Sequence, residues 1–303
     1  MSNAYESKRL DTGVSGLDDI LSGGLPSGQM YLLEGNPGTG KTTLAMQFIM
    51  AGVRAGEKSL YITLSEPASE LRGSALSHGW ELDLIPIAEF VPEEASFSPE
   101  QQYTVFHPSE IELASTIQRL TAEIEKHNPD RLVIDSLSEL RLLASDPMRY
   151  RRQLLALKQF FAGRHTTVLL LDDLTGEGHD LQLQSIAHGV IRLEKLARSY
   201  GATRRRVEII KLRGSAFREG FHDYTIQRGG LVIYPRLIAA EHSEDFQKER
   251  VQSANASLDA MFGGGLARGS STLVTGPSGC GKSTVAMQYA YAAAERGDRA
   301  IVY

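Results

Sequence analysis

The 303-residue chain has a single cysteine, Cys280, so it holds no internal disulfide bond. It has no apolar run near the roughly 20 residues of a membrane-spanning helix, and its first residues lack the apolar core of a signal peptide. The eight histidines are not spaced like zinc ligands. Lys and Arg number 32 against 37 Asp and Glu, a net charge of −5, which disfavours a broad nucleic-acid-binding surface. We therefore predict a cytoplasmic protein with no membrane contact, for which nucleic acid is a disfavoured partner.

The strongest signal that is present lies at residues 35–42, which read G-N-P-G-T-G-K-T and match the P-loop motif G-x-x-x-x-G-K-[ST]. In this motif the glycines let backbone N–H groups close around a phosphate, Lys41 reaches the outer phosphates and the Thr42 hydroxyl binds Mg²⁺. The apolar run 30–33 predicts a strand before the loop, and the pattern 43–50 predicts a helix after it, which makes an anion site. The predicted phosphate-site residues are Gly35, Asn36, Pro37, Gly38, Thr39, Gly40, Lys41, Thr42 and Thr43.

Strand and helix patterns continue to alternate after the loop. Apolar runs predict strands at 59–64, 131–135 and 166–171, and helical spacing predicts helices over 71–80, 109–127 and 148–162. This alternation is typical of a parallel sheet with helices on both faces, which is an α/β fold. From residue 189 the period changes, and the alternating stretches 190–194 and 206–211 predict an antiparallel hairpin added to the parallel sheet.

Two carboxylates stand at or just past the ends of predicted strands, at the edge where ligands bind in sheets of this kind. Asp135 ends an apolar run about 90 residues after the P-loop, which is the Walker B pattern, and we predict that it holds Mg²⁺ through the ion's water shell. Glu66 follows the strand at 59–64. It is placed to accept a proton from a water that attacks the γ-phosphate, or to orient that water. A solvated loop glutamate fits the same spacing, and the residues alone leave these alternatives open.

Two cations stand close together in the stretch K-L-R-G-S at 211–215. Residues two apart in a strand share a face, so Lys211 and Arg213 point the same way and repel each other unless an anion or acidic side chains lie nearby. Taken by itself, this pattern is better explained by a solvated sheet edge.

The chain also contains a duplication. From residue 256 it repeats its own beginning at a constant offset of 241 residues, and a second P-loop motif occupies 276–283. In this copy the predicted phosphate-site residues are Gly279, Gly281, Lys282, Ser283 and Thr284, with Ser283 as a metal ligand. We predict a first domain over 1–236, a linker over 237–255 and a truncated second domain over 256–303. The truncated domain is expected to bind phosphate without completing a catalytic site.

The order of these motifs, the stretch T-G-V-x-G-L-D at 12–18 and the duplication together resemble the KaiC-like circadian-clock ATPases of the RecA superfamily. The resemblance covers residues 12 to about 236 and resumes over 256–303. It implies a homo-hexameric ring with ATP and Mg²⁺ at the subunit interfaces, and signalling through protein partners. It further implies that Glu66 is the catalytic glutamate and that Lys211 and Arg213 reach the neighbouring subunit's nucleotide. The residues that fall near the family's nucleotide pocket are Ser77, Leu212 and Ser215.

The chain departs from this family at several positions. The family member used for comparison has two adjacent glutamates where this chain has Ser65-Glu66, and it has histidine and a Thr-Asp pair where this chain has Phe217 and Gln227-Arg228. The first departure leaves a single carboxylate as the general base. The others leave the contacts to the nucleobase and the ribose unassigned. The alternatives to a slow ATPase are a serine/threonine autokinase in a full-length form, a nucleotide-sensing scaffold with negligible turnover, and a RecA-type DNA-dependent motor.

Overall fold

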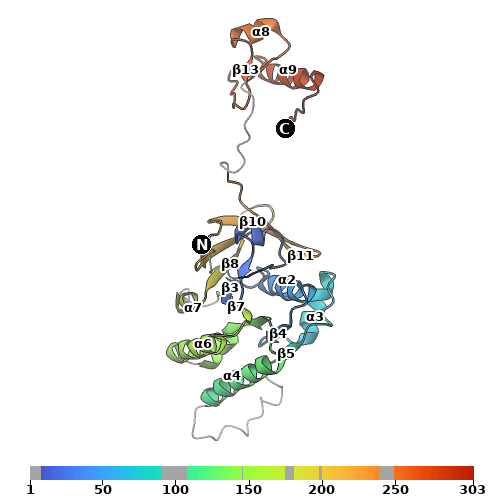
Figure 1. Ribbon diagram of the computed structural model, residues 1–303. Coiled ribbons are helices and arrows are strands. Elements are labelled where there is room, and N and C mark those ends of the chain that lie inside the picture. Colours follow the sequence, from blue (N-terminus) through green and yellow to red (C-terminus); the bar gives the residue numbers. More distant parts are fainter. Residues whose placement is uncertain (1–7, 91–107, 145, 175–180, 198–199, 239–248) are drawn as a thin grey trace, which may run out of the picture. The chain divides into compact units, whose positions relative to one another are not determined.

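The computed structural model describes residues 8–90, 108–144, 146–174, 181–197, 200–238 and 249–303, and Figure 1 follows them in the order of the sequence. The chain forms two compact units, Met1–Arg236 and Leu237–Tyr303, and each is considered by itself. Residues 239–248 of the predicted linker lie outside the described residues. Among the described residues, none of the helices combines the length and the apolar composition needed to cross a bilayer.

The first unit is built on one large sheet. Within the described residues this sheet has nine strands in the order β11-β10-β9-β8-β3-β7-β6-β4-β5. Strands β3 to β8 pair in parallel, whereas β8, β9, β10 and β11 pair antiparallel in succession. The predicted α/β fold with a late antiparallel extension is confirmed. The strands are β3 (Met30–Gly35), β4 (Ser59–Thr63), β5 (Ile87–Glu89), β6 (Arg131–Asp135), β7 (Thr167–Asp173), β8 (Gly189–Leu196), β9 (Arg204–Leu212), β10 (Phe221–Gln227) and β11 (Gly230–Tyr234).

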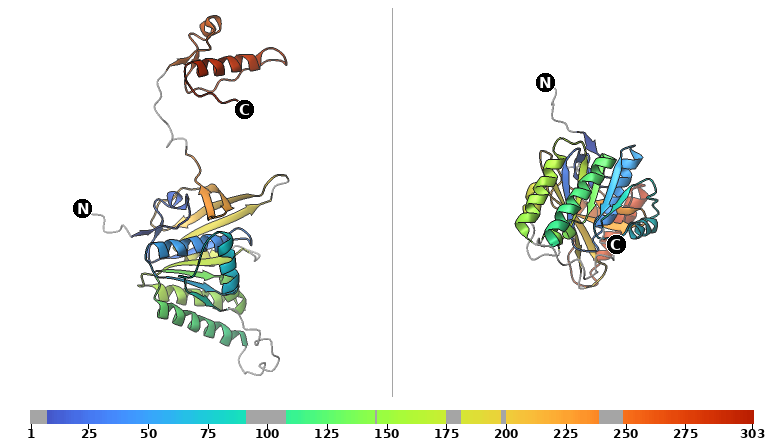
Figure 2. Two further views of the ribbon diagram at one scale, coloured as in Figure 1. Left: turned by 90° about the vertical axis from the view of Figure 1, so that its right-hand side faces the viewer. Right: turned by 90° about the horizontal axis from the view of Figure 1, so that it is seen from below.

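Helices cover both faces of this sheet, as Figure 2 shows from the side. One face packs against α1 (Leu17–Ile20), α2 (Lys41–Arg54) and α3 (Ala68–Ser77). The other packs against α4 (Pro108–His127), α5 (Leu137–Ala144), α6 (Pro147–Phe161) and α7 (Leu181–Ile186). Side chains alternate along a strand, so Tyr31 and Leu33 join the first core while Met30 and Leu32 join the second. The first unit therefore has two hydrophobic cores separated by the sheet.

Helix α6 begins one residue earlier than predicted, and the short helices α5 and α7 were not predicted. Helix α6 begins at Pro147 because the Asp146 side chain accepts a hydrogen bond from the Met148 N–H (3.2 Å), and proline is well placed in the first turn. Periodicity did not indicate α5 or α7, which are eight and six residues long. Helices this short are marginal by themselves, and both are held by side chains buried in the second core.

The second unit repeats the local contacts of the first. It contains β12 (Arg250–Val251), α8 (Ala256–Met261), β13 (Leu266–Ala267) and α9 (Lys282–Glu295), and β12 lies within the range predicted as linker. Arg250 donates to the carbonyls of Phe262 (3.3 Å) and Gly265 (3.0 Å), as Arg9 does to the carbonyls of the corresponding residues in the first unit (2.9 Å each). Several apolar side chains of this unit are exposed, among them Leu273, Met287, Tyr291, Ile301 and Val302.

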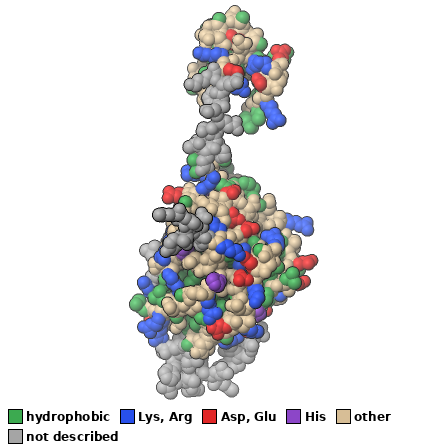
Figure 3. All heavy atoms as spheres, in the orientation of Figure 1, with side chains coloured by type: hydrophobic (Ala, Val, Ile, Leu, Met, Phe, Trp, Pro, Cys, Tyr) green, Lys and Arg blue, Asp and Glu red, His purple; other side chains and the backbone are tan. Residues whose placement is uncertain are grey.

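Charged side chains of both signs are interspersed over the face of the protein drawn in Figure 3. Some of these charges form exposed ion pairs, such as Arg204 with Asp223 (2.6 Å) and Arg164 with Glu125 (2.9 Å). Pairs exposed to this degree contribute little to the free energy of unfolding because water screens them.

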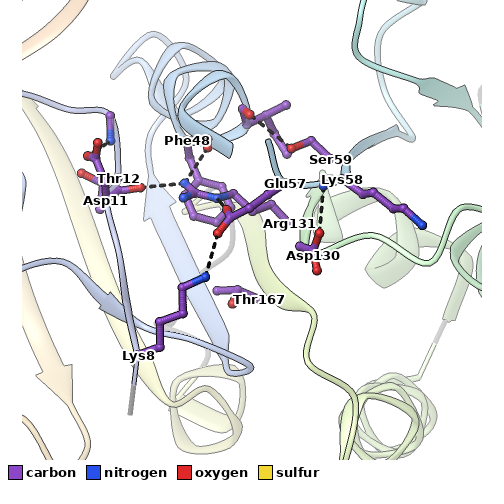
Figure 4. A network of polar contacts seen from close by, with 12 residues as sticks. Lys8, Asp11, Thr12, Phe48, Glu57, Lys58, Ser59, Asp130, Arg131 and Thr167 are labelled. Carbon is purple, nitrogen blue, oxygen red and sulfur yellow. Dashed lines mark hydrogen bonds and ion pairs between the residues drawn. The ribbon is translucent and has the colours of Figure 1, made fainter. Parts of the chain in front are cut away.

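A buried arginine at the start of β6 behaves differently (Figure 4). The side chain of Arg131 is 2% exposed and donates to Glu57 Oε2 (2.6 Å) and to the carbonyls of Asp11 (2.6 Å) and Phe48 (3.0 Å). Its guanidinium also lies 4.8 Å from the centroid of the Phe48 ring. A Cβ at Gly52 of α2 would lie 2.6 Å from Arg131 Cδ, so the helix approaches this side chain closely. Arg131 therefore joins β6, α2 and the N-terminal segment that leads to α1.

We expect Arg131→Ala to lower the free energy of unfolding of the first unit by about 3–5 kcal/mol, because it leaves Glu57 and two carbonyls without their buried donor. The matched control is Arg204→Ala, which removes an ion pair whose side chains are 46% and 51% exposed and should cost far less, because water screens the pair. Urea denaturation followed by circular dichroism measures both. Equal losses in the two variants would contradict a special role for the Arg131 contacts.

Candidate functional site

The loop between β3 and α2 forms a cradle closed by its own lysine. Gly35 ends β3 and Lys41 begins α2. Lys41 Nζ donates to the carbonyls of Gly35 (2.8 Å) and Asn36 (3.3 Å), which folds the side chain back over the loop. The loop lies at the N-terminus of a 14-residue helix, whose free N–H groups and dipole favour an anion.

Glycine is required at two positions of this loop for different reasons. Gly40 has φ 97°, and a Cβ there would lie 2.7 Å from Ile226 Cδ1 of β10. Gly35 has an ordinary backbone conformation, but a Cβ there would lie 2.6 Å from the Leu193 carbonyl of β8. Tyr224 fixes the loop further by donating from its hydroxyl to the Thr39 carbonyl (2.7 Å). The antiparallel extension therefore shapes the loop from outside.

A hydroxyl and a carboxylate meet beside the cradle in an arrangement that fits a magnesium ion. Thr42 Oγ1 donates to Asp135 Oδ2 (3.1 Å), and the Tyr61 hydroxyl donates to the same oxygen (2.6 Å). Burial raises the pKa of Asp135, while the hydrogen bonds from Tyr61 and Thr42 oppose that shift. Among the described residues, no three His, Cys, Asp or Glu side chains cluster as a metal site. One carboxylate with a hydroxyl suits Mg²⁺ that arrives with a polyphosphate and keeps part of its water shell.

Glu66 lies just beyond the end of β4, on the same edge of the sheet as Asp135. Its backbone is held by Thr63, whose Oγ1 donates to the Glu66 carbonyl (2.6 Å) and accepts from the Glu66 N–H (3.1 Å). Burial raises the pKa of its carboxyl, with smaller contributions from the charges of Asp135 and Glu70. The structure therefore places Glu66 near the candidate metal ligand, at the carboxyl ends of the strands.

The sequence analysis missed one carboxylate at this edge. Asp173, the last residue of β7, forms an ion pair with Lys41 Nζ (2.6 Å), and its Oδ2 lies 3.4 Å from Ser138 Oγ. The signal was present, because Asp173 follows the apolar run 166–171 much as Asp135 follows its own strand. Without the pairing of β7 with β3, nothing connected this residue to the loop.

Lys211 and Arg213 lie toward the other edge of the same sheet. Lys211 pairs with Val190 of β8, which pairs with Leu32 of β3, three residues before Gly35. At about 3.3 Å per residue this is about 10 Å back along the strands from Gly35, and β9 is two strands away from β3. Arg213 follows the end of β9 and lies still farther from the loop. The structure does not bring these two cations to the P-loop of the same chain.

The remaining predicted residues have other contacts. The Leu212 side chain is buried in the first core, and Ser215 Oγ accepts a hydrogen bond from Arg9 (3.1 Å). Ser77 Oγ donates to the Ser74 carbonyl within α3 (2.6 Å). None of these three contacts involves the P-loop.

The second P-loop has the same local geometry as the first. Gly279 and Gly281 have φ values of 80° and 91°, and Lys282 Nζ donates to the carbonyls of Gly276 (2.9 Å) and Pro277 (2.7 Å). Ser283 and Thr284 follow Lys282 in the first turn of α9. In the described residues of this unit, no carboxylate forms an ion pair with Lys282 as Asp173 does with Lys41.

Comparison with known proteins gives a consistent result. The family model described as "ATPase: KaiC" matches residues 10–238 and 251–303. The chain is 31% identical over 306 residues to the circadian clock oscillator protein KaiC of Acaryochloris marina, and 29% identical over 301 residues to the circadian clock protein KaiC3 of a Synechocystis strain. These alignments cover 99% and 98% of this chain but 58% and 59% of the relatives, so the chain spans less than two thirds of their length.

A solved structure resembles about three quarters of the chain. The crystal structure of a KaiC-like protein from the hyperthermophilic archaeon Pyrococcus horikoshii superposes with a TM-score of 0.63 at 28% sequence identity. The match covers 76% of this chain and 100% of that one. The RecA-like arrangement of the sheet and its helices is therefore shared.

The ion pair between Lys41 and Asp173 leads to a testable expectation. Asp173→Asn removes a negative charge that competes with phosphate for Lys41, so metal-free ATP should bind about fivefold more tightly, which corresponds to about 1 kcal/mol. Isothermal titration calorimetry in EDTA measures this affinity. Glu125→Gln, which neutralises an exposed ion pair on α4, is the matched control and should leave the affinity unchanged. Weaker binding by Asp173→Asn would contradict the competition and show that Asp173 helps to hold the nucleotide.

Proposed function

The chain belongs to the KaiC family of ATPases, and we propose that its first unit binds ATP with Mg²⁺ and hydrolyses it slowly at sites shared between neighbouring subunits of a ring. One observation supports the shared site above all. The P-loop and Glu66 lie at the carboxyl ends of the parallel strands, whereas Lys211 and Arg213 lie toward the amino ends of those strands. A second copy of the chain can bring its cations to a phosphate that this chain's own cations cannot reach.

In the proposed reaction each residue has one task. Lys41 releases Asp173 and binds the β- and γ-phosphates, and the loop N–H groups hold the remaining oxygens. Thr42 and Asp135 would hold Mg²⁺, which neutralises negative charge on the β- and γ-phosphate oxygens. Glu66 accepts the proton of a water whose oxygen attacks the γ-phosphorus. The bond to the β–γ bridging oxygen breaks, and ADP and phosphate leave.

The cations of the neighbouring subunit would stabilise the charge that develops on the γ-phosphate. Contributions of this kind reach roughly 10³–10⁵ in rate in other phosphoryl-transfer enzymes. Burial lowers the pKa of Lys211, and the nearby charges of Arg213 and Lys158 lower it further. The pair therefore gains from an incoming anion, which explains two adjacent cations better than an inert sheet edge does.

We infer a hexameric ring and a cytoplasmic role in clock-like timing or signalling, following the relatives named as circadian clock proteins. The autokinase alternative concerns a full-length form of the protein. A scaffold that binds ATP with negligible turnover is the second candidate, since a serine at position 65 leaves Glu66 without an adjacent second carboxylate.

Mixing two inactive variants tests the shared site. Glu66→Gln removes the base and Arg213→Ala removes a cation, and we expect each variant alone to release phosphate at least about a hundredfold more slowly than the unaltered protein. After subunit exchange, one kind of interface combines an intact Glu66 with an intact Arg213. Phosphate release should then recover to a measurable fraction of the unaltered rate.

The control mixes Glu66→Gln with the double variant Glu66→Gln/Arg213→Ala, a combination in which no interface has an intact base. Fluorescence energy transfer between labelled chains establishes that subunits have exchanged. A silent mixture with proven exchange would rule out the shared site and favour the scaffold.

The pKa of Glu66 predicts the pH dependence of the reaction. A base must be deprotonated, and a pKa raised above the ordinary 4.5 means that the active form is lost at a higher pH than for a solvated glutamate. Activity should therefore fall as pH decreases through a value above 4.5. Glu70→Gln removes one cause of the shift, so it should move this acidic limb to lower pH, whereas Glu125→Gln should not. An acidic limb that Glu70→Gln moves upward would contradict Glu66 as the base.

A further inference from the structure

The last three carbonyls of α7 each accept a hydrogen bond from a cation. Lys211 Nζ donates to the Gln184 carbonyl, an Arg213 NH2 group donates to the Ser185 carbonyl (2.6 Å), and Lys158 Nζ donates to the Ile186 carbonyl (3.0 Å). The C-terminal carbonyls of a helix have no partner within the helix and carry partial negative charge. The end of α7 therefore gathers the two cations of the proposed shared site and a third from α6.

Two of these cations, Lys158 and Arg213, line a cavity of about 210 Å³. Ile186, His188 and residues 28–30 and 161–163 also line it. Burial lowers the pKa of His188, and the charges of Arg213, Lys211 and Lys158 lower it further. The neutral imidazole adds no further positive charge near pH 7. A negatively charged group can thus approach Arg213 from the cavity side.

The side chain of Gln184 connects α7 to the strand that leads into the P-loop. Gln184 Nε2 donates to both carboxylate oxygens of Glu34 (3.0 and 3.1 Å). Glu34 is 3% exposed, and Arg192 of β8 also binds its Oε1 (2.6 Å). Glu34 directly precedes Gly35, whose carbonyl accepts a hydrogen bond from the Lys41 ammonium. A single residue therefore joins Glu34 through its side chain and Lys211 through its carbonyl.

Helix α7 is six residues long, which is too short for independent stability. Besides the cation bonds to its carbonyls, its described contacts include the buried side chains of Leu183 and Ile186 and the bond from Gln184 to Glu34. Leu183 and Ile186 are apolar and non-directional anchors. The hydrogen bond from Gln184 to the buried Glu34 carboxylate is directional. It therefore constrains the position of the α7 carbonyls along the direction of the strands.

We propose that Gln184 is the positioning residue for Lys211 and Arg213, and that its bond to Glu34 couples these cations to the P-loop of their own chain. This proposal rests on the proposed shared site. Gln184 acts through the α7 carbonyls and does not touch nucleotide. A shift of the loop on binding ATP in one subunit would move Glu34, and with it the cations presented to the next subunit's nucleotide.

The effect of a Gln184 substitution on phosphate release should depend on which chain of the mixed ring carries it. Gln184→Met keeps the length and helix propensity of the side chain but removes the amide donor, and Glu34 keeps its bond to Arg192. In the first mixture Gln184→Met is placed on the Glu66→Gln chain, which supplies the cations to the productive interface. In the second mixture it is placed on the Arg213→Ala chain, which supplies the P-loop and Glu66.

We expect phosphate release at saturating ATP to fall about tenfold in the first mixture, because a misplacement of about 1 Å caused far from the reacting atoms can cost up to about a hundredfold in rate. The second mixture should stay within about twofold of the parental mixture. Equal losses in both mixtures, or no loss in the first, would overturn the positioning role. A silent parental mixture would instead overturn the shared site and this proposal with it.

Two further variants complete the experiment. Gln159→Met makes the same chemical change at an exposed glutamine of α6 and should leave both mixtures unchanged. Gln184→Asn retains an amide but is one methylene too short to keep the bond to Glu34, so it should show the same asymmetry even where the methionine variant folds poorly. A loss caused by Gln159→Met would overturn the assignment to Gln184.

Discussion

Parallel pairing of β3 with β7, and of β4 with β6, is the constraint on which the candidate site depends. Strands that run the same way end at the same edge, so loops far apart in the sequence converge there. Lys41 meets Asp173 and Thr42 meets Asp135 for this reason. The buried side chains that hold the strands together on both faces thus also set the distances between the polar groups.

The antiparallel return of β9 has the opposite consequence. Because β9 runs against β8, the residues at its end lie toward the edge away from the P-loop, and Lys211 and Arg213 are directed to the α7 carbonyls. One sheet thereby presents an anion cradle at one edge and a pair of cations toward the other. Under the proposed function, a second copy supplies the cations that this chain's own cradle does not reach, and a head-to-tail contact of this kind closes into a ring when its rotation allows.

Much of this organisation was predictable from the sequence, and the reasons for the exceptions are physical. The P-loop, the strand ending at Asp135 and the change of period after residue 189 are local patterns, and the α/β fold follows from them. The partners of Lys41 and of Gln184 are not local. Asp173 lies 132 positions after Lys41, and Glu34 lies 150 before Gln184, so strand order decides which residues meet. Short α7 escaped notice because packing, rather than periodicity, stabilises it.

The duplicated second unit distinguishes structure that local sequence determines from contacts that strand order determines. In this unit Arg250 makes the contacts that Arg9 makes in the first, and the loop glycines again have positive φ values. Lys282 folds back over its loop as Lys41 does. A short sequence therefore suffices to build the cradle. The carboxylate that faces Lys41 in the first unit comes from β7, and among the described residues of the second unit no carboxylate forms such an ion pair with Lys282. The geometry of the loop is encoded locally, whereas the carboxylates beside it come from strands far apart in the sequence. Under the proposed function, Lys211 and Arg213 of a neighbouring subunit complete the site.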